Sequence, residues 1–301
     1  MLDGKKINQA ILNELKPRVD ALRAKARAPC LAVVLVGDDP ASQIYVRNKI
    51  KACQELGIRS IDATPPAEVS MSEILELIRF FNNDPQVDAI LIQSPLPKHI
   101  DEQQVLLAVD PSKDADGFHP FNVGSLVANR PAPRACTPAG IIEMLKRYQI
   151  PISGKRAVVV GRSDIVGKPM ALMLLHENAT VTVCHSKTRD LAAECRRAEI
   201  LVAAIGKAGL IGGAHLSPGV VVIDVGMNRL TDGAQVERLL GHDTQRMAAF
   251  AKNGAALVGD VEPLAMKEVS GWYTPVPGGV GPLTIAMLMA NTVRLAEEHL
   301  S

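Results

Sequence analysis

The sequence contains few cysteines, and their arrangement argues against two kinds of cross-link. There are 5 in 301 residues, an odd number, and no two of them form a C-x-x-C pair. A disulfide framework or a zinc site needs paired thiols at short spacing. We therefore expect reduced, partly buried thiols and no bound metal at Cys30, Cys53, Cys136, Cys184 and Cys195.

Excess charge and long apolar runs are also missing. Lys plus Arg number 33 and Asp plus Glu number 32, a balance that favours neither a nucleic-acid-binding protein nor a protein of membrane surfaces. No apolar run approaches the ~20 residues of a membrane-spanning helix. The first residues, Met1 to Lys6, lack the apolar core of a signal peptide. These absences predict a cytoplasmic protein.

The sequence does contain an alternation of apolar strands and amphipathic helices. Hydrophobic residues make up 47% of the chain, and its length allows two domains. Segments 31–36, 58–64 and 88–93 are typical of strands, and helices are expected at about 5–27 and 72–82. Such alternation predicts a parallel α/β sheet, whose ligands lie beyond the carboxyl ends of the strands.

A short polar turn after the first strand leads into a helix that carries a candidate site. Asp39 can cap this helix, and Pro40 can be its first residue. Ser42, Tyr45 and Lys49 then share one face of the helix. An isolated pair of this spacing is usually a packed tyrosine and a surface lysine. However, a lysine held beside a phenol has a tunable proton affinity and can act as a base or an acid.

Two later segments extend this candidate site. Gln93 ends the third strand, so it can share a cleft with Lys49. Residues 110–136 form a long irregular segment, and a loop of that length in a compact domain is more often functional than idle. Its acidic residues imitate a calcium loop. Ser112 and Val123 nevertheless stand where the first ligand and the bidentate Glu belong, so calcium is rejected.

A second α/β unit follows a helix that Thr137 is expected to cap. It contains a strand at 157–160, a turn from Gly161 to Gly167, a helix, and a strand at 180–184. This order is the dinucleotide-binding arrangement, in which glycines let the backbone approach a pyrophosphate and the helix N-terminus attracts its charge. The turn reads G-x-S-x-x-x-G instead of G-x-G-x-x-G, so the prediction depends on the surrounding strands and helix.

The choice of cofactor depends on the end of the strand at 180–184. An acidic residue there would bind a ribose hydroxyl and favour NAD. The sequence instead has Ser186, Lys187 and Thr188, with Arg162 in the first turn, and these donors and charges suit the 2′-phosphate of NADP. Two further strands with glycine turns are expected at about 200–204, followed by Gly206, and at about 220–225, followed by Gly226.

The C-terminal part of the chain is expected to return to the first domain. Residues 230–256 are typical of surface helices and loops. Residues 272–282 are the densest stretch of turn residues in the chain, a composition as typical of a plain linker as of a binding loop. The helix expected at 283–299 has no strand after it, so it can cross back to the first domain.

Six sequence blocks, in order along essentially the full chain, resemble one family. They are Tyr45-Val-Arg-Asn-Lys49, Gln93-Ser-Pro-Leu-Pro97, Lys113-Asp-Ala-Asp116-Gly, Gly161-Arg-Ser-Asp-Ile-Val-Gly-Lys-Pro169, His185-Ser-Lys-Thr188 and Thr274-Pro-Val-Pro-Gly-Gly-Val-Gly281. They resemble the bifunctional methylenetetrahydrofolate dehydrogenase/methenyltetrahydrofolate cyclohydrolase family, called FolD. One position departs from the pattern, because the family commonly reads Gln-Leu-Pro-Leu-Pro and Ser94 replaces that Leu.

The resemblance implies an α/β enzyme of two domains. A folate-binding catalytic domain would comprise residues 1–140 with 275–301, and a Rossmann domain that binds NADP would comprise 141–274 and form a homodimer. The protein would be a cytoplasmic oxidoreductase and hydrolase of one-carbon metabolism, with tetrahydrofolate derivatives as substrates and a part in purine biosynthesis. NADP+ would oxidise 5,10-methylenetetrahydrofolate to the methenyl cation, and water would convert that cation to 10-formyltetrahydrofolate.

The resemblance also implies roles for individual residues. The catalytic residues would be Lys49, Tyr45, Gln93 and Asp116, with Asp116 holding the amino-pyrimidine end of the pterin. The folate-binding residues would be Ser42, Tyr45, Gln93, Pro95, Leu96, Asp116, Pro275, Gly278 and Gly279. The NADP-binding residues would be Gly161, Arg162, Ser163, Val166, Gly167, Ser186, Lys187, Thr188, Gly206, Gly226, Met227 and Thr274.

Three other functions fit parts of the sequence. Short-chain dehydrogenases share the Tyr45/Lys49 spacing, but their glycine turn precedes the pair, whereas Gly161 follows it here. A monofunctional NADP-dependent methylenetetrahydrofolate dehydrogenase is the second, and the intact Lys49 argues against it. The third is a non-enzymatic NADP-binding regulator. An absorbance assay that follows NADPH formation and then loss of the methenyl species distinguishes these functions.

Overall fold

The computed structural model describes residues 1–300, apart from the side chain of Ala41. The chain divides into two compact units, which we call the first unit (Asn8–Cys136 with Thr284–Ser301) and the second unit (Met1–Ile7 with Thr137–Leu283). This division falls at residues 136 and 283, whereas the sequence predicts boundaries at 140 and 274, and residues 1–7 group with the second unit instead of the predicted first domain.

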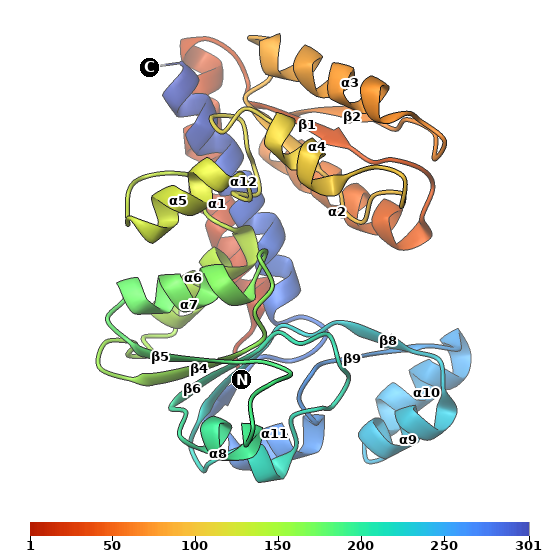
Figure 1. The fold of residues 1–301 in the computed structure, drawn as a ribbon, viewed down its shortest axis with the longest axis vertical. Helices are drawn as coiled ribbons and strands as arrows, with labels where there is room; N and C mark the ends of the chain where they lie inside the picture. Colours follow the sequence, from red (N-terminus) through yellow and green to blue (C-terminus); the bar gives the residue numbers. More distant parts are fainter. Residues whose placement is uncertain (301) are drawn as a thin grey trace. The chain divides into compact units, whose positions relative to one another are not determined.

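The first unit is built on a three-stranded parallel sheet in the order β2-β1-β3 (Figure 1). The strands are β1 (Cys30–Val34), β2 (Arg59–Ala63) and β3 (Ala89–Ile92), each within two residues of its predicted bounds. Every residue of β1 and β3 is buried, as expected of strands covered on both faces. Helices α2 (Pro40–Leu56) and α3 (Met71–Asn83) follow β1 and β2.

The segment 110–136, predicted to be irregular, contains a helix, so that prediction was wrong in part. Helix α5 (Pro120–Val127) begins where His119 Nδ1 accepts the N–H of Phe121 at 3.1 Å, and it buries Asn122 and Leu126. Pro120 at its first position was the available signal. A further short helix, α4 (Glu102–Ala108), precedes the segment.

Helix α12 (Val280–His299) runs beside α1 (Gly4–Lys25) in the first unit (Figure 1). Arg18 of α1 pairs with Glu297 of α12 at 2.6 Å, and Lys25 Nζ donates to the carbonyl of Leu300 at 2.8 Å. Helix α12 begins at Val280, three residues earlier than expected. Pro282 lies in the first turn, where backbone N–H groups have no intrahelical partner, so the N–H that proline lacks costs the helix no hydrogen bond.

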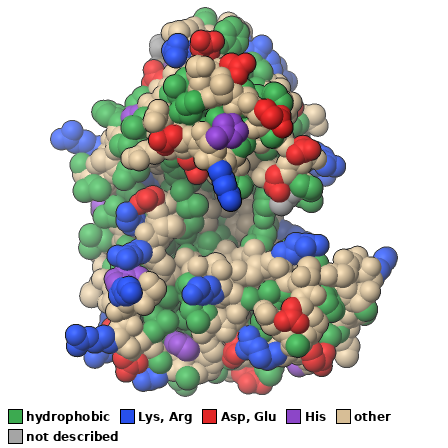
Figure 2. Space-filling view, turned by 45° about the vertical axis from the view of Figure 1, so that its right-hand side comes forward, with side chains coloured by type: hydrophobic (Ala, Val, Ile, Leu, Met, Phe, Trp, Pro, Cys, Tyr) green, Lys and Arg blue, Asp and Glu red, His purple; other side chains and the backbone are tan. Residues whose placement is uncertain are grey.

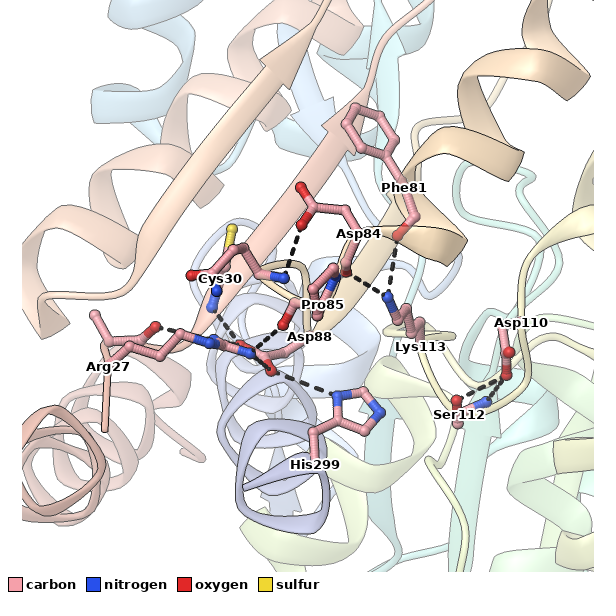
Figure 3. A network of polar contacts seen from close by, with 12 residues as sticks. Arg27, Cys30, Phe81, Asp84, Pro85, Asp88, Asp110, Ser112, Lys113 and His299 are labelled. Atoms are coloured by element: carbon pink, nitrogen blue, oxygen red, sulfur yellow. Dashed lines mark hydrogen bonds and ion pairs between the residues drawn. The ribbon is translucent and has the colours of Figure 1, made fainter. Parts of the chain in front are cut away.

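A buried carboxylate, Asp88, joins the ends of several elements of the first unit (Figure 3). It accepts hydrogen bonds from both terminal nitrogens of Arg27, at 2.6 and 2.8 Å, and from the N–H of Cys30 at 2.8 Å. His299, the last residue of α12, lies 3.4 Å from the same carboxylate. The network therefore ties α12 to the amino-terminal ends of β1 and β3, at the sheet edge opposite the carboxyl ends.

The second unit contains a five-stranded parallel sheet in the order β10-β7-β6-β4-β5. Its strands are β4 (Arg156–Val160), β5 (Thr180–Cys184), β6 (Ile200–Ala203), β7 (Val221–Asp224) and β10 (Trp272–Tyr273). Its helices include α6 (Cys136–Arg147), α7 (Gly167–His176), α8 (Leu191–Arg196) and α11 (Pro263–Val269). Strand order reverses at β4, between β5 and β6, and such a switch point is where α/β sheets bind ligands.

Residues 230–256 include the expected surface helices, α9 (Gly233–Leu240) and α10 (Thr244–Asn253). The sequence did not predict the antiparallel pair of β8 (Asn228–Leu230) and β9 (Ala256–Val258) that flanks them. These elements bury a small core of Val236, Leu239, Leu240 and Val258. Helix α6 begins at Cys136, so Thr137 lies inside it and is not its cap, contrary to expectation.

All five cysteines are free, and they are fully buried instead of partly buried. On the face drawn in Figure 2, Lys and Arg side chains are interspersed with Asp and Glu, as the near-zero net charge leads one to expect. Among residues 1–300, no helix combines the length and the apolar character that crossing a membrane requires.

Candidate functional site

The helix that carries the first candidate residues begins as the sequence predicts. Pro40 is its first residue, and the carboxylate of Asp39 accepts the N–H of Ser42 at 2.8 Å. Ser42 and Lys49 are buried, with exposed fractions of 3% and 9%, whereas Tyr45 is 42% exposed. Lys49 is thus held inside the unit, and Tyr45 lies at its surface one turn earlier.

Lys49 and Gln93 meet at the carboxyl end of the first sheet. The amine of Lys49 donates to Oε1 of Gln93 at 3.0 Å. The amide nitrogen of Gln93 donates to the carbonyl of Ser94 at 2.7 Å, which fixes the oxygen toward the amine. The backbone N–H of Gln93 bonds to Val34 at 2.9 Å, so the glutamine follows the last paired residue of β3 directly. The predicted juxtaposition of Lys49 and Gln93 is confirmed.

Residues after Gln93 show how the departure from the family pattern is accommodated. The hydroxyl of Ser94 donates to the carboxylate of Glu102, and the Ser94 side chain is exposed. Leu96 is partly buried and packs against the core of the first unit, whereas Pro95 is exposed. Polar Ser94 therefore faces water and leaves no gap in the core.

Asp114 brings the predicted site residue Asp116 to the same sheet edge. The chain at Asp114 pairs with Ile90 of β3 as a parallel bridge. The Asp114 carboxylate accepts the N–H groups of Gly117 at 3.0 Å and His119 at 2.8 Å. It also accepts from the side chain of Asn122 at 2.9 Å. The sequence suggested a functional loop here, and the structure shows that Asp114 shapes it.

Asp116 is electrostatically coupled to Lys49. Burial raises the pKa of the Asp116 carboxyl to about 6, and the charge of Lys49 opposes that rise. The neighbouring Asp114 raises the pKa further, and a hydrogen bond with Cys136 lowers it. Lys49, Gln93 and Asp116 therefore form one cluster, in which a cationic amine lies near an uncharged amide and a carboxyl that titrates near neutrality.

Sequence reasoning missed Cys136 and Asn291, which support this cluster. Burial and the charge of Asp116 raise the pKa of the Cys136 thiol well above its usual value, so it stays protonated. The amide of Asn291 donates to the carbonyls of Ala115 at 2.8 Å and Arg134 at 3.0 Å, and it also contacts the thiol. An amide on the buried face of the apolar α12 could have indicated from the sequence that Asn291 is functional. Nothing in the sequence indicated Cys136.

Two glycines of the dinucleotide turn are needed for contacts within the chain. Gly161 has φ of +124°, and a Cβ there would lie 2.1 Å from the carbonyl oxygen of Ala204, after β6. A Cβ on Gly167 would lie 2.3 Å from the carbonyl oxygen of Gly161. The Ser163 hydroxyl accepts the N–H groups of Val166 and Gly167 at 3.3 Å. The turn thus brings the ends of β4, β6 and α7 close together at the switch point.

The residues predicted to select NADP lie at the end of β5 and in the first turn. Arg162, Ser186 and Lys187 are exposed. The hydroxyl of Thr188 accepts the N–H of His185 at 2.9 Å, which shapes the turn. Positions 186–188, where an acidic residue would favour NAD, contain no Asp or Glu. Hydroxyl and cationic donors at this position fit a phosphate better than a ribose hydroxyl.

The remaining predicted residues lie on loops of the second unit. Thr274 is fully buried, and its hydroxyl accepts the N–H of Asp224 at 2.8 Å. The carbonyl of Gly278 accepts the N–H of Gly4 at 3.1 Å, and a Cβ on Gly4 would lie 1.6 Å from the oxygen of Gly279. Met227 is 39% exposed. The structure therefore anchors this glycine loop on the chain's own N-terminal residues.

These features define a class of α/β protein. One unit has a Lys-Gln-Asp cluster at the carboxyl end of its parallel sheet, and the other is a Rossmann-type unit. The chain belongs to the tetrahydrofolate dehydrogenase/cyclohydrolase family. Residues 2–116 match its catalytic domain, and residues 135–300 match its NAD(P)-binding domain. The match confirms the expected family, fold class and nucleotide-binding unit.

Individual relatives match over nearly the whole chain. The bifunctional protein FolD of Solibacter usitatus is 59% identical over 299 residues, which cover 99% of this chain and 98% of the relative. The crystal structure of FolD from Campylobacter jejuni has a TM-score of 0.90 and 44% identity, covering 99% and 98% of the two chains. The Trypanosoma brucei enzyme, solved with NADP and an inhibitor, has a TM-score of 0.88 and 36% identity, covering 99% and 97%.

Proposed function

We propose that this protein catalyses two successive reactions of folate one-carbon metabolism. It oxidises 5,10-methylenetetrahydrofolate to 5,10-methenyltetrahydrofolate with NADP+, and it hydrolyses the methenyl product to 10-formyltetrahydrofolate. The observation that carries this proposal is the Lys49–Gln93 hydrogen bond of 3.0 Å beside Asp116, in a chain whose two parts match the family's catalytic and NAD(P)-binding domains.

The second unit supplies the cofactor site. NADP+, when bound, accepts the hydride from the one-carbon bridge of the folate. Gly161, Ser163 and Gly167 shape the turn that would receive the pyrophosphate, and Arg162, Ser186 and Lys187 would hold the 2′-phosphate. The other residues proposed to contact the cofactor are Val166, Thr188, Gly206, Gly226, Met227 and Thr274.

Hydride transfer requires alignment of the two ligands and no proton transfer at the migrating carbon. Asp116 contributes to this alignment by binding, because a carboxylate can accept paired hydrogen bonds from the amino-pyrimidine end of the pterin. The other residues proposed to contact the folate are Ser42, Tyr45, Gln93, Pro95, Leu96, Pro275, Gly278 and Gly279. Ser42, which is small and buried, would help to set the shape of the proposed folate-binding surface.

Hydrolysis of the methenyl cation requires water to be activated and protons to move. In its neutral form the amine of Lys49 can take a proton from the attacking water, and Tyr45 can pass one between the amine and solvent because it is exposed. Gln93 holds the amine through an uncharged oxygen, so it orients Lys49 without adding negative charge beside it.

We further propose that residues 1–140 with 275–301 provide the folate-binding part and that residues 141–274 provide the NADP-binding part. The proposed assembly is a homodimer formed through the NADP-binding part. The proposed compartment is the cytoplasm, where free thiols such as the five buried cysteines persist. The 10-formyl product would serve purine biosynthesis.

A paired absorbance assay tests the function. The protein is mixed with 5,10-methylenetetrahydrofolate and NADP+, and NADPH and the methenyl species are followed together. We expect NADPH to form and the methenyl species to appear only transiently. If NADPH forms but the methenyl species disappears only at its spontaneous rate, the protein has dehydrogenase activity and no cyclohydrolase activity. No NADPH at all would contradict the proposal entirely.

A further inference from the structure

A carboxylate in the second unit, Asp260, gathers the loop that follows β6. Asp260 is fully buried. Its Oδ2 accepts the N–H groups of Ile205 at 2.5 Å and Gly206 at 2.9 Å, and its Oδ1 accepts the N–H of Lys207 at 2.9 Å. Three successive N–H groups that converge on one point form the kind of nest that binds anions in other proteins. Here a side chain from more than fifty residues later fills the nest.

This loop lies where the second unit is proposed to bind its cofactor. It leaves the carboxyl end of β6, which neighbours β4 at the point where the strand order reverses. Gly206 has φ of +71°, and a Cβ there would meet no atom within 4 Å, unlike the crowded Gly161. The loop is therefore held from one side by Asp260 and open on the other side.

Asp260 is itself fixed from two directions. The amide of Asn228 donates to its Oδ1 at 2.9 Å, and its backbone N–H donates to Asp224 at 2.9 Å. Asp224 also accepts the N–H groups of Gly226 at 2.9 Å and Val261 at 3.0 Å. The two carboxyls thus link the loops after β6 and β7, which carry Gly206 and Gly226.

The burial of these groups makes the arrangement sensitive to substitution. Burial raises the pKa of the Asp224 carboxyl to about 7, and the charge of Asp260 contributes to that rise. Among residues 1–300, backbone N–H groups and the amide of Asn228 hold these two buried carboxyls, and no Lys or Arg side chain bonds to either. When one oxygen of such a carboxylate is replaced by an NH2 group, the N–H bonds that this oxygen accepted are lost.

We propose that Asp260 is a positioning residue for the dinucleotide. Its carboxylate fixes the backbone of Ile205, Gly206 and Lys207 in the conformation that receives the cofactor, and so it sets the affinity for NADP+. Asp260 does not touch the cofactor. The inference rests on the proposed function of the second unit, and it assigns to Asp260 a role in the dehydrogenase reaction and none in the cyclohydrolase reaction.

The test uses Asp260→Asn, which keeps the size of the side chain and turns an amide toward N–H groups. The substitution removes hydrogen bonds to a charged group, which are stronger than bonds between neutral groups. We therefore expect KM and Kd for NADP+ to rise by roughly 10-fold or more. The cyclohydrolase rate, which needs no cofactor, should stay within about twofold. Asp232→Asn is the matched control, because Asp232 also accepts a backbone N–H, from Ala234 at 3.0 Å, but at the start of α9.

Two results would overturn the role of Asp260: an unchanged Kd for NADP+ in the folded variant, or an equal fall of both activities, which marks a general structural role. If Asp260→Asn does not fold, Asn228→Ala removes one anchor of the same carboxylate and should raise the Kd for NADP+ about threefold. An unchanged Kd in that variant would likewise reject the inference. Failure of the wild-type protein to bind NADP+ would instead reject the proposed function.

Discussion

The amine of Lys49 lies 3.0 Å from Oε1 of Gln93, and this uncharged oxygen is the acceptor that the structure gives it. The carboxyl of Asp116 is close enough to interact with the same amine through charge. Gln93 therefore orients the amine of Lys49 through an oxygen that carries no charge. On this basis we propose separate roles for the three residues: Lys49 for proton transfer, Gln93 for orientation and Asp116 for binding.

Replacement of Lys49 should separate the two reactions. Lys49→Met keeps much of the volume of the stem and removes the group that carries the proton, so cyclohydrolase activity should fall by roughly 10²–10⁴-fold while dehydrogenase activity remains measurable. Methenyltetrahydrofolate should accumulate. Lys49→Arg should not restore hydrolysis, because the guanidinium stays charged. Methenyl absorbance over time in each folded variant is the measurement, and wild-type hydrolysis in Lys49→Met would remove Lys49 from the mechanism.

Asp116 should act on both reactions through folate binding. Asp116→Ala should weaken both activities and leave the Kd for NADP+ within about twofold, since its partners lie in the first unit. In the wild type, folate affinity should fall as the pH drops below about 6, the raised pKa of this carboxyl, because the protonated acid accepts fewer hydrogen bonds. Folate titrations at several pH values would show this. Selective loss of the cyclohydrolase step in Asp116→Ala would contradict the assignment.

The same carboxyl should make stability depend on pH. Its pKa is raised from 3.8 to about 6 in the folded protein, so between those values the folded chain holds a proton that the unfolded chain has released. The contribution of Asp116 to the free energy of unfolding is therefore fully present below about pH 4 and is lost as the pH rises through 6. Relative to wild type, Asp116→Asn should gain up to about 3 kcal/mol between pH 4 and pH 8. Denaturant unfolding of both proteins at the two pH values measures this difference, and a constant difference would refute it.

Preference for NADP+ over NAD+ should depend on the exposed cations of the second unit. Arg162→Ala and Lys187→Ala should each lower the ratio of kcat/KM for NADP+ to that for NAD+ by roughly 10-fold or more, with the NAD+ reaction little changed. The loss should shrink at high salt, because both side chains are exposed. Lys155→Ala, which removes an exposed pair with Glu199, is a control in the same unit. Equal kcat/KM for the two cofactors in the wild type would end this explanation.

Gly161→Ala should destabilise the protein by more than an ordinary glycine substitution in a turn. The new Cβ would lie 2.1 Å from the carbonyl oxygen of Ala204, and φ of +124° is strained for alanine. Gly154→Ala is the matched control, because Gly154 also has positive φ but a Cβ there meets nothing within 4 Å. The free energy of unfolding should fall by roughly 2 kcal/mol more in Gly161→Ala. Similar denaturation midpoints for the two variants would show that the turn tolerates a side chain.

The sequence predicts those parts of the site that depend on local pattern and on parallel-sheet geometry. Lys49 and Gln93 each follow a strand, and the carboxyl ends of neighbouring parallel strands meet, so their contact was predictable. Cys136 and Asn291 reach the cluster through contacts with partners up to 176 residues away, which no local pattern reveals. The same is true of Asp260, whose bonds to the Gly206 loop span more than fifty residues.

Errors in the predicted elements have equally local reasons. Helix α5 lies in a segment rich in Asp, Gly and Pro, and its stability comes from the buried Asn122 and Leu126 more than from helix propensity. Strands β8 and β9 have three residues each, too few for an alternating pattern to show. The expectation of an irregular loop at 110–136 failed in part because the Asp114 carboxylate organises the segment through hydrogen bonds from Gly117 and Asn122.

The first unit is discontinuous, since residues 8–136 are joined by a C-terminal segment that includes most of α12, and this division has a consequence for synthesis on the ribosome. The first sheet and helix α2, which carries Lys49, emerge early, yet His299 can reach Asp88 only after the whole of α12 has been translated. Domains generally fold in the order in which they emerge. Here the contacts between α12 and the early part of the first unit can form only after the second unit has been translated.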